Sequence, residues 1–172
     1  MEEEDFQEVI LETVKKVFNF QCSAKVELKD SETYKEGQEW GGQGQTDVTS
    51  MTYLSAEDVN CSVGICFSKP SYLKYISAMF GEEVTEFDDQ TTDASGEFLN
   101  MIMGNIKAKY YESNKKDIES TFPMSFFGRP SIFKIDSDIK LKVYPMESHL
   151  GPVFAIISFG KEPIMPWSQD FF

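Results

Sequence analysis

The chain has 172 residues, of which 41% are hydrophobic and 14% aromatic, and its formal net charge is -13. This composition is typical of one packed domain, here residues 1–172, and the negative charge opposes binding to nucleic acid and to anionic membranes. Because no apolar run approaches the roughly 20 residues of a membrane span and the start MEEEDFQEV has no signal-peptide pattern, we expect a cytoplasmic protein without a membrane segment.

The first predicted element is an amphipathic helix over residues 5–20, with its apolar side chains on one stripe and Asp5 as its candidate N-cap. Residues 23–29 alternate between apolar and polar side chains, which predicts a strand. Residues 30–45 are polar and rich in glycine, so they predict a flexible insertion, either a long loop or a splayed hairpin.

Two strands and a short helix are predicted next. Residues 46–54 form the first strand, and residues 60–68 form the second, with apolar side chains of one parity that predict a half-buried strand. The helix falls within residues 68–81, because Pro70 suits a first helical turn and Gly81 suits a helix end.

The second half of the chain combines one long helix with returning strands. An acidic linker, residues 82–90, precedes a helix predicted over residues 91–112. Alternation then predicts strands within residues 123–128, 131–135, 138–145 and 152–160. A coil that caps the core is expected for the tail. We therefore predict an α+β fold with a mainly antiparallel sheet of about six strands and about three helices packed on it.

The three cysteines offer no metal or disulfide pattern. Cys22, Cys61 and Cys66 are odd in number, and the only histidine, His149, has no matching ligand spacing. Cys61 and Cys66 are five positions apart, which places them on opposite faces of a strand. Buried thiols in a reduced compartment are favoured over a redox role.

The helix predicted over residues 91–112 has two contrasting faces at 100° per residue. Its core face contains Ala94, Phe98, Leu99, Ile102, Met103, Ile106 and Tyr110. Its opposite face contains Asp93, Glu97, Asn100, Gly104, Lys107 and Tyr111, with Met101 at the margin. An exposed helix face needs no function to carry charged and amide side chains. Gly104 is unusual on such a face, because glycine in a helix interior lowers the stability of the helix by about 1 kcal/mol relative to alanine.

A family resemblance gives this face a second interpretation. Asp93, Glu97, Asn100 and Pro123 have the spacing Asp or Ser, three residues, Glu, two residues, Asn, 22 residues, Pro. This pattern resembles the signature of the CheC, CheX and FliY chemotaxis phosphatases. The order of strands, short helix, acidic linker, long helix and FPMSFFG segment also resembles CheX over about 150 residues. The first helix lacks the paired asparagine, so the resemblance implies one active helix, as in CheX.

The resemblance implies a phosphatase that hydrolyses the aspartyl phosphate of a phosphorylated CheY-type receiver in chemotaxis signalling. Asn100 would orient the attacking water, and Glu97 would pair with the receiver's active-site lysine. Partner contacts would fall on Asp93, Met101, Gly104 and Lys107. The receiver would contribute Mg²⁺ and the lysine, so no cofactor is expected in this chain.

An alternative with the same fold is a binding module that docks a receiver or a flagellar switch component without catalysis, as the middle domain of FliM does. The intact pair of Glu97 and Asn100 favours the enzyme, because a docking module has no need of the asparagine. Characterised relatives include homodimers, and edge strands offer a route to a homodimer here.

Overall fold

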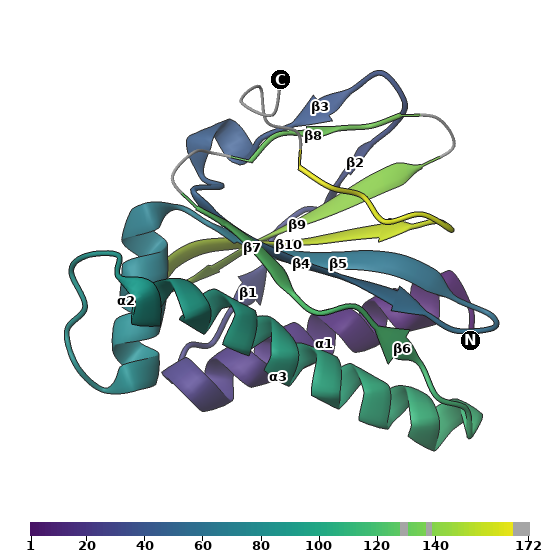
Figure 1. The fold of residues 1–172 in the computed structure, drawn as a ribbon, viewed down its shortest axis with the longest axis horizontal. Coiled ribbons are helices and arrows are strands. Elements are labelled where there is room, and N and C mark those ends of the chain that lie inside the picture. Colours follow the sequence, from purple (N-terminus) through teal and green to yellow (C-terminus); the bar gives the residue numbers. More distant parts are fainter. Residues whose placement is uncertain (128–130, 137–138, 167–172) are drawn as a thin grey trace.

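A computed structural model describes residues 1–127, 131–136 and 139–166. Figure 1 shows its elements in chain order. They are α1 (Glu3–Cys22), β1 (Glu27–Leu28), β2 (Glu32–Tyr34), β3 (Glu39–Trp40), a 3-10 turn η1 (Gly42–Gly44), β4 (Val48–Ser55), β5 (Asn60–Phe67), α2 (Lys69–Phe80), α3 (Asp89–Asn114), β6 (Glu119–Ser120), β7 (Met124–Phe127), β8 (Phe133–Lys134), β9 (Lys140–Ser148) and β10 (Gly151–Phe159).

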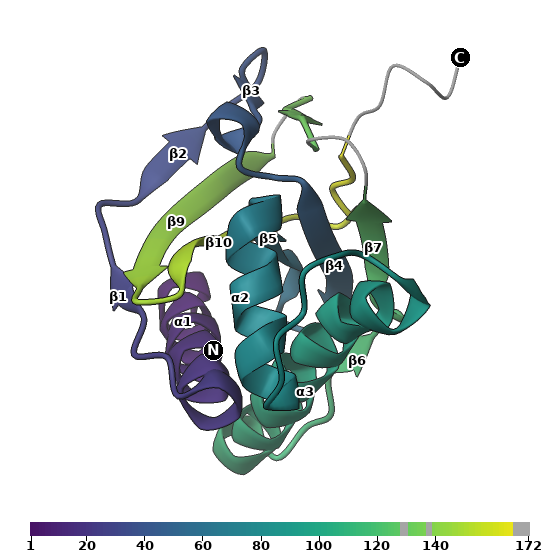
Figure 2. The same ribbon diagram turned by 90° about the vertical axis from the view of Figure 1, so that its left-hand side faces the viewer.

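All the pairings between the described strands are antiparallel. The large sheet has the order β1-β9-β10-β5-β4-β6, and β2 also pairs with β9 while β7 also pairs with β4. A second, two-stranded sheet joins β3 to β8. The three helices α1, α2 and α3 lie together on one face of the large sheet (Figure 2). The predicted α+β class and the helices packed on an antiparallel sheet are therefore confirmed.

The described residues contain ten strands, more than the predicted six. The strands that were not predicted, β2, β3 and β6, are two or three residues long. The predicted strands within residues 23–29, 123–128 and 131–135 correspond to β1, β7 and β8. Alternation over so few residues is not distinguishable from coil in a sequence, so only long-range pairing reveals these strands.

The sheet separates two hydrophobic clusters. The larger lies between the helices and the sheet and includes Phe18, Phe67 and Phe98. The smaller lies on the opposite face and consists of Trp40, Met51, Cys66, Phe133, Ile135, Leu141, Val143, Ile156 and Ile164. Strand β5 is consequently buried on both faces, so the prediction of a half-buried strand is wrong.

Residues 30–45 do not form the predicted loop or hairpin. Strand β2 pairs with β9 and β3 pairs with β8, so these two strands bond to distant strands and not to each other. The side chain of Trp40 is buried, with its ring 6.0 Å from that of Phe133 and 5.3 Å from that of Phe154. Burial of this large aromatic surface ties the segment to the second face of the sheet. In the tail, Ile164 joins the same cluster, while residues 167–172 lie outside the described residues.

Two helix ends test the predicted caps. Helix α1 begins before Asp5, and its N-cap position is Glu2, so Asp5 belongs to the first turn with Glu3 and Glu4. These acids still favour the helix because its N-terminus carries partial positive charge. Helix α2 agrees with the prediction, because Pro70 lies in its first turn and Gly81 ends the helix at φ 71°. The structure adds an N-cap at Ser68, whose side chain accepts a hydrogen bond from the Ser71 amide.

All three cysteines are buried and unpaired, and Cys61 and Cys66 fall in the clusters on opposite faces of β5, as predicted. Burial raises the pKa of each thiol to about 12. Below that pKa the thiols are protonated and unreactive, because the thiolate is the nucleophile.

We therefore expect the native protein at pH 8 to react with a disulfide-exchange reagent roughly a thousandfold more slowly than free cysteine does. The measurement is the release of the reagent's chromophore over time. After unfolding in denaturant, all three thiols should react at the ordinary rate. Rapid reaction of one thiol in the folded protein would contradict the burial of that side chain.

Candidate active site

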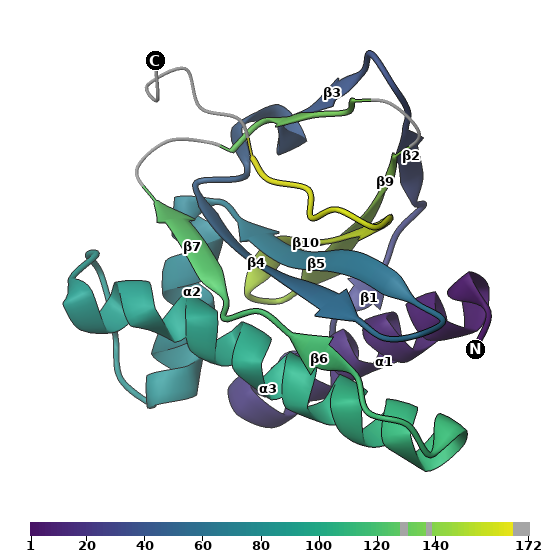
Figure 3. The same cartoon turned by 45° about the vertical axis from the view of Figure 1, so that its right-hand side comes forward.

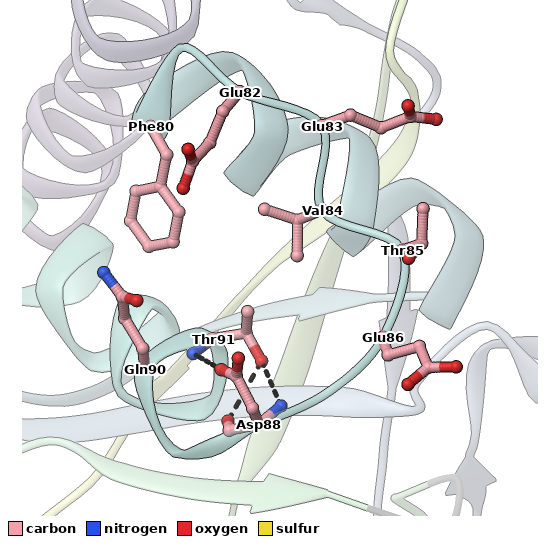
Figure 4. Close-up of a pocket in the computed structure, with 9 residues that line it drawn as sticks. All are labelled: Phe80, Glu82, Glu83, Val84, Thr85, Glu86, Asp88, Gln90 and Thr91. Carbon is pink, nitrogen blue, oxygen red and sulfur yellow. Dashed lines mark hydrogen bonds between the residues drawn. The ribbon is translucent and has the colours of Figure 1, made fainter.

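Helix α3 begins at a complete capping box. The Asp88 carboxylate accepts a hydrogen bond from the Thr91 amide at 2.8 Å, and the Thr91 hydroxyl accepts one from the Asp88 amide at 2.7 Å (Figure 4). The reciprocal bonds satisfy backbone donors at the helix end that would otherwise have no partner. The helix is two residues longer at each end than the predicted 91–112.

The two faces of α3 follow the predicted periodicity. Every residue assigned to the core face is buried, and the hydroxyl of the neighbouring Tyr72 donates a hydrogen bond to the Thr91 carbonyl. Asp93, Glu97, Asn100, Gly104 and Tyr111 are exposed, while Met101 and Lys107 are partly buried. The structure therefore brings the predicted site residues together along one solvent-facing stripe of a helix that is fixed by its opposite face.

Glu97 and Asn100 lie one helical turn apart on this stripe, where residues at i and i+3 are neighbours. Within the described ranges, neither side chain has a hydrogen-bond or ion-pair partner, so both are available to a ligand. A carboxylate supplies only acceptors, whereas an amide supplies an acceptor oxygen and two donor hydrogens. The pair can therefore hold a cation with one group and orient a water molecule with the other.

Gly104 lies one turn beyond Asn100. A Cβ atom built on it would meet nothing within 4 Å, so packing inside the protein does not require glycine there. The result is a bare patch of helix backbone beside the pair. An approaching molecule can come closer to the helix at this position than at any residue with a side chain.

Strand β7 lies alongside the N-terminal half of α3 (Figure 3). The Ser95 hydroxyl donates a hydrogen bond to Ser125 Oγ at 3.0 Å, and Ser125 Oγ lies 2.7 Å from Ser50 Oγ. This chain of hydroxyls joins α3, β7 and β4. Pro123 immediately precedes β7, which explains how a proline 23 positions beyond Asn100 belongs to the same part of the fold. The sequence contains no local signal for the serine contacts.

The acidic linker before α3 borders a shallow hollow. Figure 4 shows the Glu83 and Glu86 carboxylates pointing away from it, while Asp88 is turned to Thr91. Across the part of the chain that the structure describes, no three His, Cys, Asp or Glu side chains are grouped so that they could hold a metal ion. The acidic linker therefore contributes one residue, Asp88, to the cap of α3.

A comparison with models of protein families shows the family of this chain. The model of the family "Chemotaxis phosphatase CheX" matches residues 48–145, more than half of the chain, and includes the whole of α3. The chain belongs to the CheX family. The residues that carry the predicted signature, from Asp93 to Pro123, all fall within the matched range.

Solved structures agree with the CheX fold. A CheC-like superfamily protein from Shewanella sp. PV-4 has a TM-score of 0.77 and 21% identity, over 93% of this chain and 99% of that one. CheX from Vibrio vulnificus has a TM-score of 0.76 and 21% identity, over 91% and 99%. CheX from Borrelia burgdorferi, solved in a complex with CheY, BeF3 and Mg²⁺, has a TM-score of 0.67 and 16% identity, over 91% and 98%. No curated protein sequence matches the chain.

Among the described helices, none combines the length and the apolar composition needed to cross a membrane.

Proposed function

We propose that this CheX-family protein hydrolyses the aspartyl phosphate of a CheY-type receiver and so ends the receiver's signal. The observation that carries the proposal is the pair Glu97 and Asn100. Both side chains are exposed on one turn of α3 and have no hydrogen-bond or ion-pair partner among the described residues, while the opposite face of the helix is buried. Membership of a phosphatase family supports it. So does the Borrelia burgdorferi relative, whose structure contains CheY.

Asn100 would orient the attacking water. Phosphoryl transfer needs little covalent chemistry from the catalyst, because positioning and charge stabilisation supply most of the acceleration. The side-chain oxygen of Asn100 would accept a hydrogen bond from the water and hold its oxygen in line with the scissile P–O bond. Attack forms the new P–O bond, breaks the bond to the aspartyl oxygen, and leaves inorganic phosphate and a free carboxylate.

Glu97 would set the docking register. Its carboxylate would pair with the lysine of the receiver's active site, and such a charge-assisted contact is stronger than a neutral hydrogen bond. A charge pair that is buried in the interface also disfavours other orientations of the receiver on this helix. In this scheme the receiver supplies both the lysine and the Mg²⁺, so the chain contributes no cofactor.

The remaining predicted contacts would surround the pair. Asp93 lies one turn before Glu97 on the exposed stripe, and Met101 and Lys107 lie at its margins. An interface of standard size covers about 800 Å² on each partner, so a receiver centred on the pair would cover all three.

The decisive experiment measures phosphate release from a phosphorylated receiver of the source organism with and without the wild-type protein. The receiver is charged with a small phosphodonor, which is then removed. We expect the protein to accelerate release catalytically, so that one molecule turns over many receivers. An unchanged rate with every receiver would reject the phosphatase, and binding without acceleration would favour the docking module.

Substitution of Gly104 by alanine should separate stability from docking. The new methyl group meets open space, so we expect the free energy of unfolding to rise by about 1 kcal/mol through helix propensity alone. The same methyl group should weaken binding of the receiver, because it occupies the bare backbone patch. The measurements are denaturant unfolding and titration with the receiver. A variant that is more stable and binds with unchanged affinity would remove Gly104 from the interface.

A further inference from the structure

The connection between β6 and β7 contains an irregularity that the proposed mechanism does not use. In the pairing with β4, Ser120 lies opposite Leu54 and Met124 lies opposite Met51. Three residues, 121–123, therefore face only two residues of β4, which is a β-bulge. The central residue of this bulge is Phe122, whose side chain is 93% exposed, more than any other large hydrophobic residue that the structure describes.

The backbone on both sides of Phe122 is fixed. The Thr121 amide donates to the Tyr53 carbonyl at 3.0 Å, and the Tyr53 amide donates to the Thr121 hydroxyl at 3.0 Å. The Thr52 hydroxyl also donates to the Thr121 carbonyl at 2.8 Å. On the other side, Pro123 restricts the residue before it to an extended backbone. The exposed ring is thus held on a rigid support and not on a mobile loop.

The bulge lies beside the row of α3 that carries Asn100. Gly96, Asn100 and Lys107 follow one another on the helix surface at spacings of four and seven residues. Ser125 Oγ is 4.0 Å from the position of a Cβ atom on Gly96, so this row faces the β6–β7 connection. Figures 1 and 3 both show the connection running next to α3, in the opposite direction.

The spacing along the two elements places Phe122 level with the site. Three extended residues from Ser125 to Phe122 span about 10 Å, and four helical residues from Gly96 to Asn100 span about 6 Å. Because both displacements point toward the C-terminal end of α3, the backbone positions of Phe122 and Asn100 differ by only about 4 Å along the helix axis.

We propose that Phe122 is a binding hot spot for the phosphorylated receiver and contacts an apolar part of the receiver's surface. This inference rests on the proposed function. A contact of about 800 Å² on each partner corresponds to a circle of about 16 Å radius, so a receiver centred on Asn100 also covers the bulge. Aromatic residues on a preorganised backbone dominate interface energies because little freedom is lost on binding.

The test replaces Phe122 by alanine and measures two quantities separately. The dissociation constant is measured with the receiver activated by beryllofluoride, a stable mimic of the phosphoryl group, and the maximal rate is measured with saturating phosphorylated receiver. We expect the dissociation constant to rise at least tenfold and the maximal rate to stay within about twofold of wild type, because Phe122 does not touch the reacting atoms. Phe122→Leu should recover part of the affinity.

Phe20 provides a matched control. It is 82% exposed on α1, which lies on the other side of α3 from the β6–β7 connection (Figure 2). Phe20→Ala should leave the dissociation constant unchanged.

The proposal is overturned if Phe122→Ala binds the activated receiver as tightly as wild type does. It is equally overturned if the variant only lowers self-association in sedimentation, because the ring then serves a second copy. A wild-type protein that binds the receiver without hydrolysis would reject the proposed function and still allow this contact to be measured.

Discussion

Asn100→Ala is expected to slow the dephosphorylation of a bound receiver about a hundredfold, which corresponds to about 2.7 kcal/mol of transition-state stabilisation. The reason is that Asn100 would act on the water, and the water is fully ordered only in the transition state. Affinity for the beryllofluoride-activated receiver should remain close to that of wild type. The measurement is single-turnover phosphate release at saturating protein, which separates chemistry from binding.

The control for this substitution is Asn19→Ala. Asn19 is an exposed asparagine on α1, so its replacement changes helix propensity and surface polarity in the same way without approaching the site. It should leave both rate and affinity unchanged. If Asn100→Ala retains the wild-type single-turnover rate, another group must orient the water, and the role given to Asn100 is wrong.

Glu97→Ala should weaken both binding and phosphate release. A charge-assisted hydrogen bond contributes about 1.5–3 kcal/mol, so we expect roughly a tenfold to hundredfold loss of affinity for the activated receiver. The maximal rate should also fall, because the receiver loses the contact that aligns its phosphoryl group with Asn100. Titration of the activated receiver at several salt concentrations measures the first effect, and single-turnover kinetics measures the second.

Glu112→Ala is the matched control, since Glu112 is an exposed glutamate near the other end of the same helix. A sharper design reverses the charges. Glu97→Lys should abolish binding to the wild-type receiver, and a receiver whose lysine is replaced by glutamate should recover part of the affinity. Equal affinities for wild type and Glu97→Ala would show that no such ion pair forms.

Much of the candidate site was predictable because a helix encodes its faces locally. A repeat near 3.6 residues separates Phe98 and Ile102 from Glu97 and Asn100, and the structure buries the first pair and exposes the second. Each end of α3 lies two residues beyond the predicted range. At its start the N-cap is Asp88, which lies in an acidic linker where several residues are possible N-caps. Exposure alone did not identify a function. The fixed spacing to Pro123 supplied the family, which the family comparison confirms.

The short strands and the surroundings of the site were not predictable in the same way. Strands β2 and β3 are defined by pairing with β9 and β8, about a hundred residues further along the chain. The second hydrophobic cluster, which covers the other face of β5, likewise brings Trp40 and Phe133 together from distant segments. No local pattern contains these partners.

The sequence by itself therefore determined the helical faces, the helix ends near Ser68 and Gly81, the α+β class and the signature shared with the CheX family. Only the tertiary structure decided that β2 and β3 pair with β9 and β8, that β5 is buried on both faces, and that Phe122 is exposed on a bulge. The physical reason is the range of the interactions. Periodicity and capping act between residues a few positions apart, whereas strand pairing and the packing of a second layer join residues that become neighbours only when the chain folds.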